Sequence, residues 1–231
     1  MLFKSGILTQ ASGSIGGITA SHNRGGMYFR ARAIPTDPNT GPQATMRAIL
    51  GSLADRWNNT LITAERDAWN LYASLTTVIG PLGDPLVLSG QQTYIRSNSV
   101  RAQNAQGIVD AAPTQFDLGE LGVPTLDAAG TGPLGNVDIG FDNTLPWAND
   151  DDGFMAVLIS RPQNPSINYF RGPYRNSGGI QGITIGPPTS PATINAAFPF
   201  TAGQRVFVKL RVTEADGRLT QSIYLGPVVV A

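Results

Sequence analysis

The sequence has no cysteine and a single histidine, His22, among its 231 residues. The missing thiols exclude a disulfide scaffold, a Cys-ligated zinc site and a thiol nucleophile. One histidine in a predicted turn argues against a hydrolytic triad or a His-rich metal site. No phosphate loop, dinucleotide fingerprint or nucleophile elbow is present, and no run approaches the roughly 20 apolar residues of a membrane span. We therefore expect a protein that is not an enzyme and that uses no cofactor, no small-molecule substrate and no membrane.

Charge is also scarce, and it is unevenly distributed. Charged residues make up 14% of the chain, below the roughly 25% of a typical soluble domain. Residues 110–152 hold nine acids and no base, whereas residues 161–211 hold six bases and no acid. Such segments can be solvated loops of one sign, or complementary patches that meet when copies pack together. With a net charge of zero, the domain-wide basic excess expected of a nucleic-acid-binding protein is missing.

Residues 1–38 are predicted to form an extended arm or β-hairpin. Two extended runs, 14–21 and 27–34, flank the turn sequence "HNRGG", in which Asn and Gly tolerate positive φ. In the second run Phe29 and Ala31 alternate with Tyr28, Arg30 and Arg32. A two-stranded ribbon is marginally stable alone in water. The arm therefore needs a surface, on its own domain or on a neighbouring subunit.

Residues 39–106 are predicted to form a helical hairpin and a third helix. Each helix start is marked by a capping residue or a first-turn acid: Thr40 with Gln43, Thr63 with Glu65, and Ser89 with Gln92. The loop after residue 59 is short, so the first two helices are expected to pair antiparallel. Helical spacing assigns Trp57, Trp69 and Tyr72 to a core rather than to a ligand platform.

After a Gly- and Pro-rich linker at 107–135, residues 136–231 are predicted to form an antiparallel β-sandwich. The expected strands are 137–141, 154–160, 179–186, 192–200, 205–213 and 218–230. In 205–213 the valines and Leu210 face inward, and Phe207, Lys209 and Arg211 face outward. The fold class is therefore α+β, with a sandwich of the fibronectin type III or immunoglobulin kind.

Two local features of this half could bind a ligand. The run "NDDDG", residues 149–153, offers carboxylates for Ca²⁺, but it lacks the EF-hand spacing and is equally an ordinary acidic turn before a strand. Aromatic residues on sandwich loops would serve a receptor- or glycan-binding module. The candidates are Trp147, Tyr169, Phe170 and Tyr174.

The first 105 or so residues carry a family pattern. Their motifs are "GSIGG", "MYFRAR", "P.DPNT..Q..MR", "W…L..AERDAW..YA" and "YIRSN..R". The pattern rests on Gly16, Gly17, Arg30, Arg32, Pro35, Pro38, Thr40, Gln43, Arg47, Trp57, Arg66 and Trp69. It resembles a group of uncharacterised phage and prophage structural proteins with a Gly-rich arm and a helical hairpin before a sandwich. The resemblance implies a part of the virion rather than an enzyme.

The leading hypothesis is a homo-oligomeric bacteriophage virion protein that decorates the capsid or belongs to the neck or tail. It would assemble through its arm with itself and with other virion proteins. The expected assembly contacts are Tyr28, Arg30, Arg32 and Arg47, with Asp150, Asp151 and Asp152 as the complement on the next copy. The alternative is a receptor- or glycan-binding sandwich module of a tail fibre or baseplate.

Overall fold

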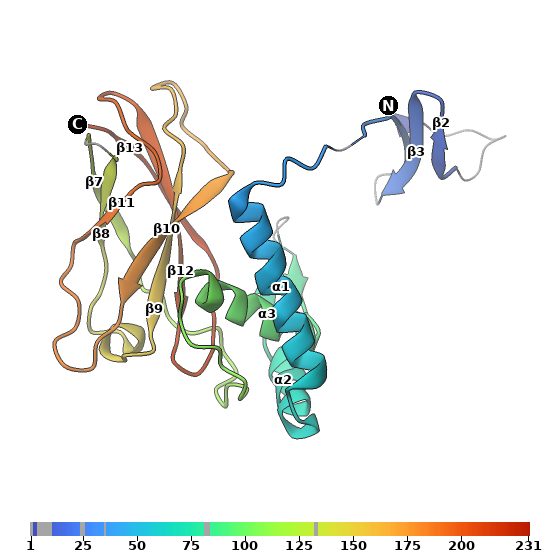
Figure 1. The fold of residues 1–231 in the computed structure, drawn as a ribbon. Helices are drawn as coiled ribbons and strands as arrows, with labels where there is room; N and C mark the ends of the chain where they lie inside the picture. The colour runs from blue at the N-terminus through green and yellow to red at the C-terminus, as the bar shows by residue number, and fades with distance from the viewer. Residues whose placement is uncertain (1, 4–10, 24–25, 35, 81–83, 132–133) are drawn as a thin grey trace. The chain divides into compact units, whose positions relative to one another are not determined.

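The computed structural model describes residues 2–3, 11–23, 26–34, 36–80, 84–131 and 134–231 (Figure 1). Three α-helices and several antiparallel sheets make the described part of the chain an α+β protein. The chain separates into two compact units, Met1–Ala44 and Thr45–Ala231.

The first unit is a four-stranded antiparallel sheet in the order β1-β4-β3-β2. Its strands are β1 (Leu2–Phe3), β2 (Gly13–Ile15), β3 (Ile18–Asn23) and β4 (Gly26–Ala31). The expected hairpin is present as β3 and β4; residues 24–25 of its turn, and Pro35 beyond it, lie outside the described residues. The prediction of one unbroken strand at 14–21 is wrong. The chain turns at Gly16 and Gly17, where Gly16 has φ +56°, a conformation that glycine adopts without a steric penalty.

The strand register divides this sheet into an apolar and a polar face. Ile18 lies opposite Ala31, and Ala20 lies opposite Phe29. Ile15 of β2 adds to the same face because it lies opposite Ile18. Thr19 opposite Arg30, and Ser21 opposite Tyr28, form the other face. No side chain described between 11 and 44 is buried, so the described part of this unit has no core of its own.

The second unit contains α1 (Gly41–Asn59), whose first turn lies at the unit boundary, α2 (Thr63–Leu75) and α3 (Gly90–Gln103). The expected caps are present. The Ser89 amide donates to Gln92 Oε1 at 3.0 Å and the Gln92 amide donates to Ser89 Oγ at 3.3 Å. The Thr40 amide donates to Gln43 Oε1 at 3.2 Å. Local side-chain chemistry therefore sets these helix starts.

An aromatic cluster holds the helices together and confirms the core role of Trp57, Trp69 and Tyr72. The main helix packing, however, is α2 against α3 rather than the predicted pairing of the first two helices. The Tyr94 ring of α3 contacts both tryptophans, with centroid distances of 5.6 Å to Trp57 and 5.5 Å to Trp69. The backbones of α2 and α3 also lie close together, because a Cβ added at Gly90 would lie 2.7 Å from the Asn70 amide nitrogen.

Two antiparallel sheets make up most of the rest of the unit. One has the order β10-β9-β12-β13 and the other β11-β8-β7; the pair β5-β6 stands apart. Figure 1 shows β7, β8 and β11 on one side and β9, β10 and β12 facing them. The bounds are β5 (Val78–Ile79), β6 (Pro85–Leu86), β7 (Thr125–Gly130), β8 (Asn136–Gly140), β9 (Phe154–Ser160), β10 (Tyr174–Gln181), β11 (Ala192–Asn195), β12 (Arg205–Thr213) and β13 (Ile223–Val229).

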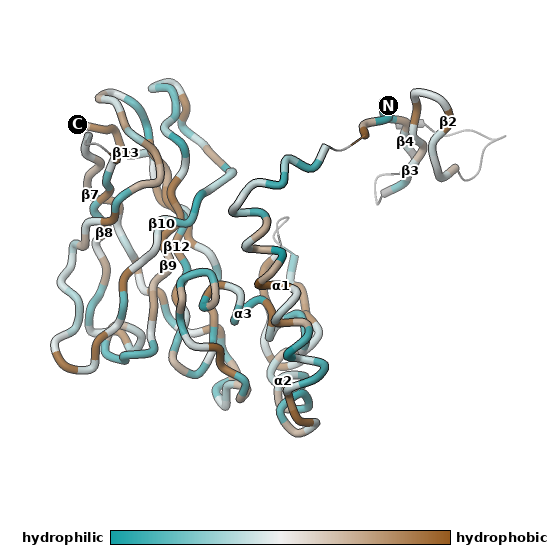
Figure 2. The backbone as a smooth tube through the Cα atoms, viewed as in Figure 1, coloured by the Kyte–Doolittle hydropathy of each residue, from teal (hydrophilic) through white to brown (hydrophobic). Residues whose placement is uncertain are grey.

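The two sheets share one hydrophobic core, and Figure 2 shows hydrophobic segments along β9 and β12. Trp147 of the 3₁₀ helix η1 (Pro146–Asn149) is fully buried in that core. Strands β9 and β12 have the predicted bounds. Strand β7 lies inside the stretch that the sequence favours as a linker.

Strand β10 is displaced from the prediction of a strand at 179–186, which is wrong after residue 181. There the Gly182 amide donates to the Gly153 carbonyl and the Ile183 amide donates to the Ala148 carbonyl, so the chain leaves the sheet. Ile185 is 90% exposed. Ile183 and Ile185 alternate with polar residues in the sequence, but this alternation does not mark a side that packs on the core.

Helix α3 joins the helices to the sheets. Val100 packs with Phe154, Ala156 and Leu219 in one buried cluster. The nearby Arg101 is 1% exposed and donates from Nε to the Gly107 carbonyl at 2.6 Å. The three helices and the two sheets around the shared core thus lie mainly in one compact unit. The sequence-based division places them in separate regions, and that division stays a prediction.

Candidate functional site

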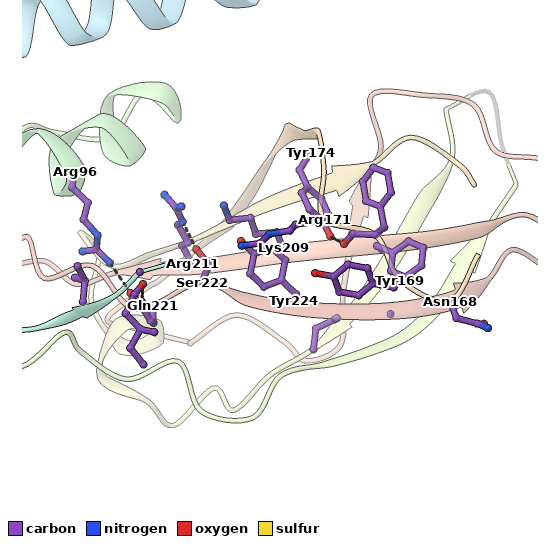
Figure 3. Close-up of a pocket in the computed structure, with 17 residues that line it drawn as sticks. Arg96, Asn168, Tyr169, Arg171, Tyr174, Lys209, Arg211, Gln221, Ser222 and Tyr224 are labelled. Atoms are coloured by element: carbon purple, nitrogen blue, oxygen red, sulfur yellow. Dashed lines mark hydrogen bonds between the residues drawn. The ribbon is translucent and has the colours of Figure 1, made fainter. Parts of the chain in front are cut away.

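A groove with a volume of about 970 Å³ lies over the outer face of the sheet β10-β9-β12-β13. We call it the basic groove. It is lined by residues 78–80 and 168–171, and by Arg96, Tyr174, Phe207, Lys209, Arg211, Gln221, Ser222, Tyr224, Leu225 and Gly226. Along β12, Val206, Val208, Leu210 and Val212 point into the core, so the residues between them face the groove. Figure 3 shows its labelled side chains in a row, from Arg96 at one end to Asn168 at the other.

One wall of the groove is aromatic. The Phe170 ring stacks on Phe207 at 5.7 Å and meets Tyr174 edge-on at 5.3 Å. The Tyr174 hydroxyl donates to the Phe170 carbonyl at 2.9 Å, which fixes the loop against the strand. Burial raises the pKa of Tyr174 to about 12. Tyr224 of β13 continues the wall, 5.9 Å from the Tyr174 ring.

The cations of the groove come from α3 and β12. Arg96 donates to the carbonyls of Leu219 and Thr220, both at 2.9 Å. Arg211 donates from Nε to Ser222 Oγ at 2.7 Å (Figure 3). The Lys209 ammonium lies 5.4 Å from the centre of the Tyr224 ring, a cation–π contact. These contacts hold the positive charges in place.

No acid is found among the described residues that line the groove, and the charges there are only partly hydrated. Burial, together with the charge of Arg211, lowers the pKa of Lys209 from 10.5 to about 8. The same two causes lower the pKa of Arg96 to about 10. Burial also lowers the pKa of Arg211. The groove is therefore a place where a negative charge would be stabilised.

In chemical terms the groove offers cations, hydrogen-bond donors and ring faces. The lining residues that the structure describes include no histidine and no carboxylate. In the described part of the chain, no group of three or more His, Cys, Asp or Glu residues could hold a metal ion. The arrangement is suited to holding an anion with an apolar face.

The residues predicted as assembly contacts in the arm lie on one side of the first sheet. Tyr28 and Arg30 are on its polar face, and Arg32 follows the strand, with its amide donating to the Gly17 carbonyl at 2.8 Å. The Arg30 and Arg32 side chains are exposed. Arg47 belongs to α1 in the second unit.

The acidic turn is an exposed, hydrogen-bonded turn before β9. Asp150 Oδ1 accepts from the Asp152 amide, and Asp151 Oδ1 accepts from the Thr184 amide, both at 2.9 Å. The Arg101 guanidinium donates to the Asp152 carbonyl at 3.1 Å. Two of the three carboxylates thus organise the turn, and all three remain at the surface.

The aromatic residues proposed as ligand contacts divide into two groups. The expectation of an exposed loop aromatic is wrong for Trp147, which the sheets enclose completely. Tyr169, Phe170 and Tyr174 all line the basic groove. The sequence analysis missed Arg96 and Tyr224. The sequence does contain a signal for Tyr224, because its neighbours Ile223 and Leu225 pack on the core and an alternating strand would turn Tyr224 outward. No sequence pattern points to Arg96.

Two acids of the stretch 110–152 pair within the second unit, with arginines that lie outside the base-rich segment 161–211. Asp110, from the acidic stretch, accepts from Arg56 in an ion pair and from the Tyr94 hydroxyl at 2.9 Å. Arg56 and this hydrogen bond hold the pKa of Asp110 below its usual value. Asp117 pairs with Arg218 at 2.5 Å. Part of the acidic stretch is therefore neutralised inside its own chain.

Comparison of the chain with protein-family models, with curated proteins and with solved structures gives no match. Among the described residues, no helix has the length and apolar character needed to cross a bilayer.

Proposed function

We propose that this protein is a homo-oligomeric structural component of a bacteriophage virion. It would decorate the capsid or form part of the neck or tail, and its first unit would attach it to other copies and to other virion proteins. The single observation that carries the proposal is a four-stranded sheet with an exposed apolar face and no buried described side chain.

The apolar face supports attachment through burial on another chain. Ile15 is 89% exposed and Ile18 is 54% exposed. Removing such side chains from water is favourable by roughly 25 cal/mol per Å². A small sheet whose described part has no core gains this stabilisation only on a surface outside itself, which in this proposal is a partner chain. Repeated contacts in a closed assembly would offset the entropy lost when the arm is ordered.

The polar face supplies the second part of the proposed interface. Tyr28, Arg30 and Arg32 would contact acidic groups of the next copy, and the exposed Asp150–Asp152 turn offers such groups. Arg47 would add a contact from α1. Complementary charges at the edge of an apolar interface fix register more than affinity.

For the second unit we infer a β-sandwich of the fibronectin type III or immunoglobulin kind. The inference rests on one four-stranded and one three-stranded antiparallel sheet that share one core. Immunoglobulin-type domains divide their seven strands between two sheets in the same way. The sandwich would project from or bridge the assembly while the arm anchors it.

The experiment compares Ile18→Asp with Ile185→Asp. Both isoleucines are exposed, but Ile185 belongs to the second unit and to neither face of the arm sheet. Light scattering after size-exclusion chromatography is expected to show an oligomer for the full chain and for Ile185→Asp. It is expected to show a monomer for Ile18→Asp and for a chain lacking residues 1–35. Oligomers of unchanged mass for both of these last variants would refute attachment through the arm.

Mass spectrometry of purified particles then distinguishes the possible positions. Hundreds of copies would place the protein in the shell, and about six or twelve would place it in the neck or tail. Absence of the chain from particles would contradict the virion role.

A further inference from the structure

The basic groove concentrates positive charge. Arg96, Lys209 and Arg211 all line it, and among the described residues no carboxylate does. No hydrogen bond or ion pair of the Lys209 ammonium is present among the described residues, and its close neighbour is the Tyr224 ring. A half-buried ammonium of this kind gains a strong, charge-assisted hydrogen bond when a carboxylate binds beside it.

Aromatic ring faces lie next to that charge. Tyr224 is 54% exposed and Tyr169 is 75% exposed, so their rings remain accessible beside the Phe170–Tyr174 wall. An apolar C–H face of a ligand would stack against such rings. Ser222 and Gln221 add hydroxyl and amide groups at the same site, and these can exchange hydrogen bonds with ligand hydroxyls.

The size of the groove suits a small ligand. Its volume of about 970 Å³ lies at the upper end of the roughly 300–1,000 Å³ typical of ligand pockets. We propose that the basic groove binds an acidic sugar, a pyranose ring that carries a carboxylate. Lys209 and Arg211 bind the carboxylate, and Tyr224 with Tyr174 supports the ring. The proposal does not depend on assembly through the arm, because every groove residue belongs to the second unit.

A single-stranded nucleic acid would need some of the same groups, since such sites combine a basic groove with stacking aromatics. The charge balance favours the sugar instead. The chain has no net positive charge, and polyanion binding depends on many neutralised phosphates. The groove is thus arranged for one anionic group beside a ring.

The test is calorimetric titration of the full chain with two acids, digalacturonic acid and N-acetylneuraminic acid. Each has its methyl ester as a neutral counterpart. At least one acid is expected to bind, and its ester to bind at least about tenfold more weakly. Raising the pH through 8 is expected to weaken binding of the acid, because Lys209, with its pKa of about 8, loses its charge there.

Three variants separate a groove site from general attraction. Lys209→Met is expected to reduce affinity for the acid about tenfold or more, and Tyr224→Leu severalfold. Arg161→Met is the matched control, because Arg161 lies in the same base-rich segment but outside the groove lining; its affinity should stay within about twofold. Circular dichroism verifies that each variant is folded.

Four results would overturn the proposal. They are the absence of binding by either acid, equal binding of acid and ester, unchanged affinity in both groove variants, and an equal loss in Arg161→Met. An eight-nucleotide oligothymidylate serves as the competing probe. If it binds with a steep salt dependence while neither acid binds, the groove is a nucleic-acid site.

Discussion

The arm sheet and the sheet β10-β9-β12-β13 are both four-stranded and antiparallel, but their surroundings differ. In the sheet β10-β9-β12-β13, one face is closed by a second sheet, and the other carries a groove that loop and helix residues complete. In the arm sheet, the described side chains of both faces are open to solvent. Alternation therefore determines which side chains share a face, while the rest of the chain determines whether that face becomes a core, a ligand site or an attachment surface.

The largest change in the free energy of unfolding is expected from a substitution in the helical core, and it can be compared with a substitution in the arm sheet. Trp69 is fully buried, and its indole N–H donates to the Asp110 carbonyl at 2.7 Å. Trp69→Ala should lower the free energy of unfolding by about 3–5 kcal/mol, measured by urea denaturation with circular dichroism. Ile18→Asp should change it by less than about 0.5 kcal/mol. Equal losses in the two variants would mean that the arm is part of the folded core.

A smaller loss is expected at the junction of α3 with the sheets. Arg101 donates to the carbonyls of Gly107, Asp152 and Glu214, and burial lowers its pKa. Arg101→Met keeps most of the volume but leaves buried carbonyls without donors, at a cost of about 2–4 kcal/mol. The same denaturation experiment measures it. A change below about 0.5 kcal/mol would show that these bonds do not stabilise the unit.

A substitution in the basic groove is expected to raise the stability of the protein rather than lower it. Lys209 has a lower pKa in the folded chain than its usual 10.5, so below pH 8 folding must desolvate a charge, whereas above about pH 10.5 the amine is neutral in both states. Lys209→Met should therefore stabilise the protein at pH 7 by about 1 kcal/mol, after allowance for solvent screening of a half-exposed group. The gain should shrink between pH 8 and 10.5. A destabilised variant at pH 7 would contradict this account.

The smallest global effect is expected in the arm turn. Gly16→Ala places a side chain where φ is +56°, at a local cost of about 1 kcal/mol. Hydrogen exchange of the β2 and β3 amides should accelerate, while the urea midpoint of the second unit stays unchanged. A shifted midpoint would show that the two units unfold together.

Much of the fold could be predicted because it depends on local chemistry. Ser89 and Gln92 set the start of α3, and near-continuous apolar residues set β9. The predictions are wrong where contacts between residues far apart in the sequence determine the structure. Tyr94 lies between the two tryptophans and redirects the helix packing. At residue 182, bonds to 148 and 153 take the chain out of the sheet.

The candidate site was accessible from the sequence only in part. The pattern of β12 indicates that Lys209 and Arg211 face outward, as they do. It does not indicate that Arg96, more than a hundred residues earlier, lines the same groove. Phe207 shows the limit of the pattern most clearly. It faces away from the core, yet it is only 4% exposed, because Phe170 covers it.

The dispersed origin of the groove lining has a practical consequence. Because its lining comes from α3, four strands and three loops, the complete site exists only while the second unit is intact. Occupancy is therefore linked to the melting temperature: a ligand at a hundred times its dissociation constant would add about 2.7 kcal/mol to stability. A thermal-shift screen of chemically diverse compounds can thus search for natural ligands with the unlabelled full chain.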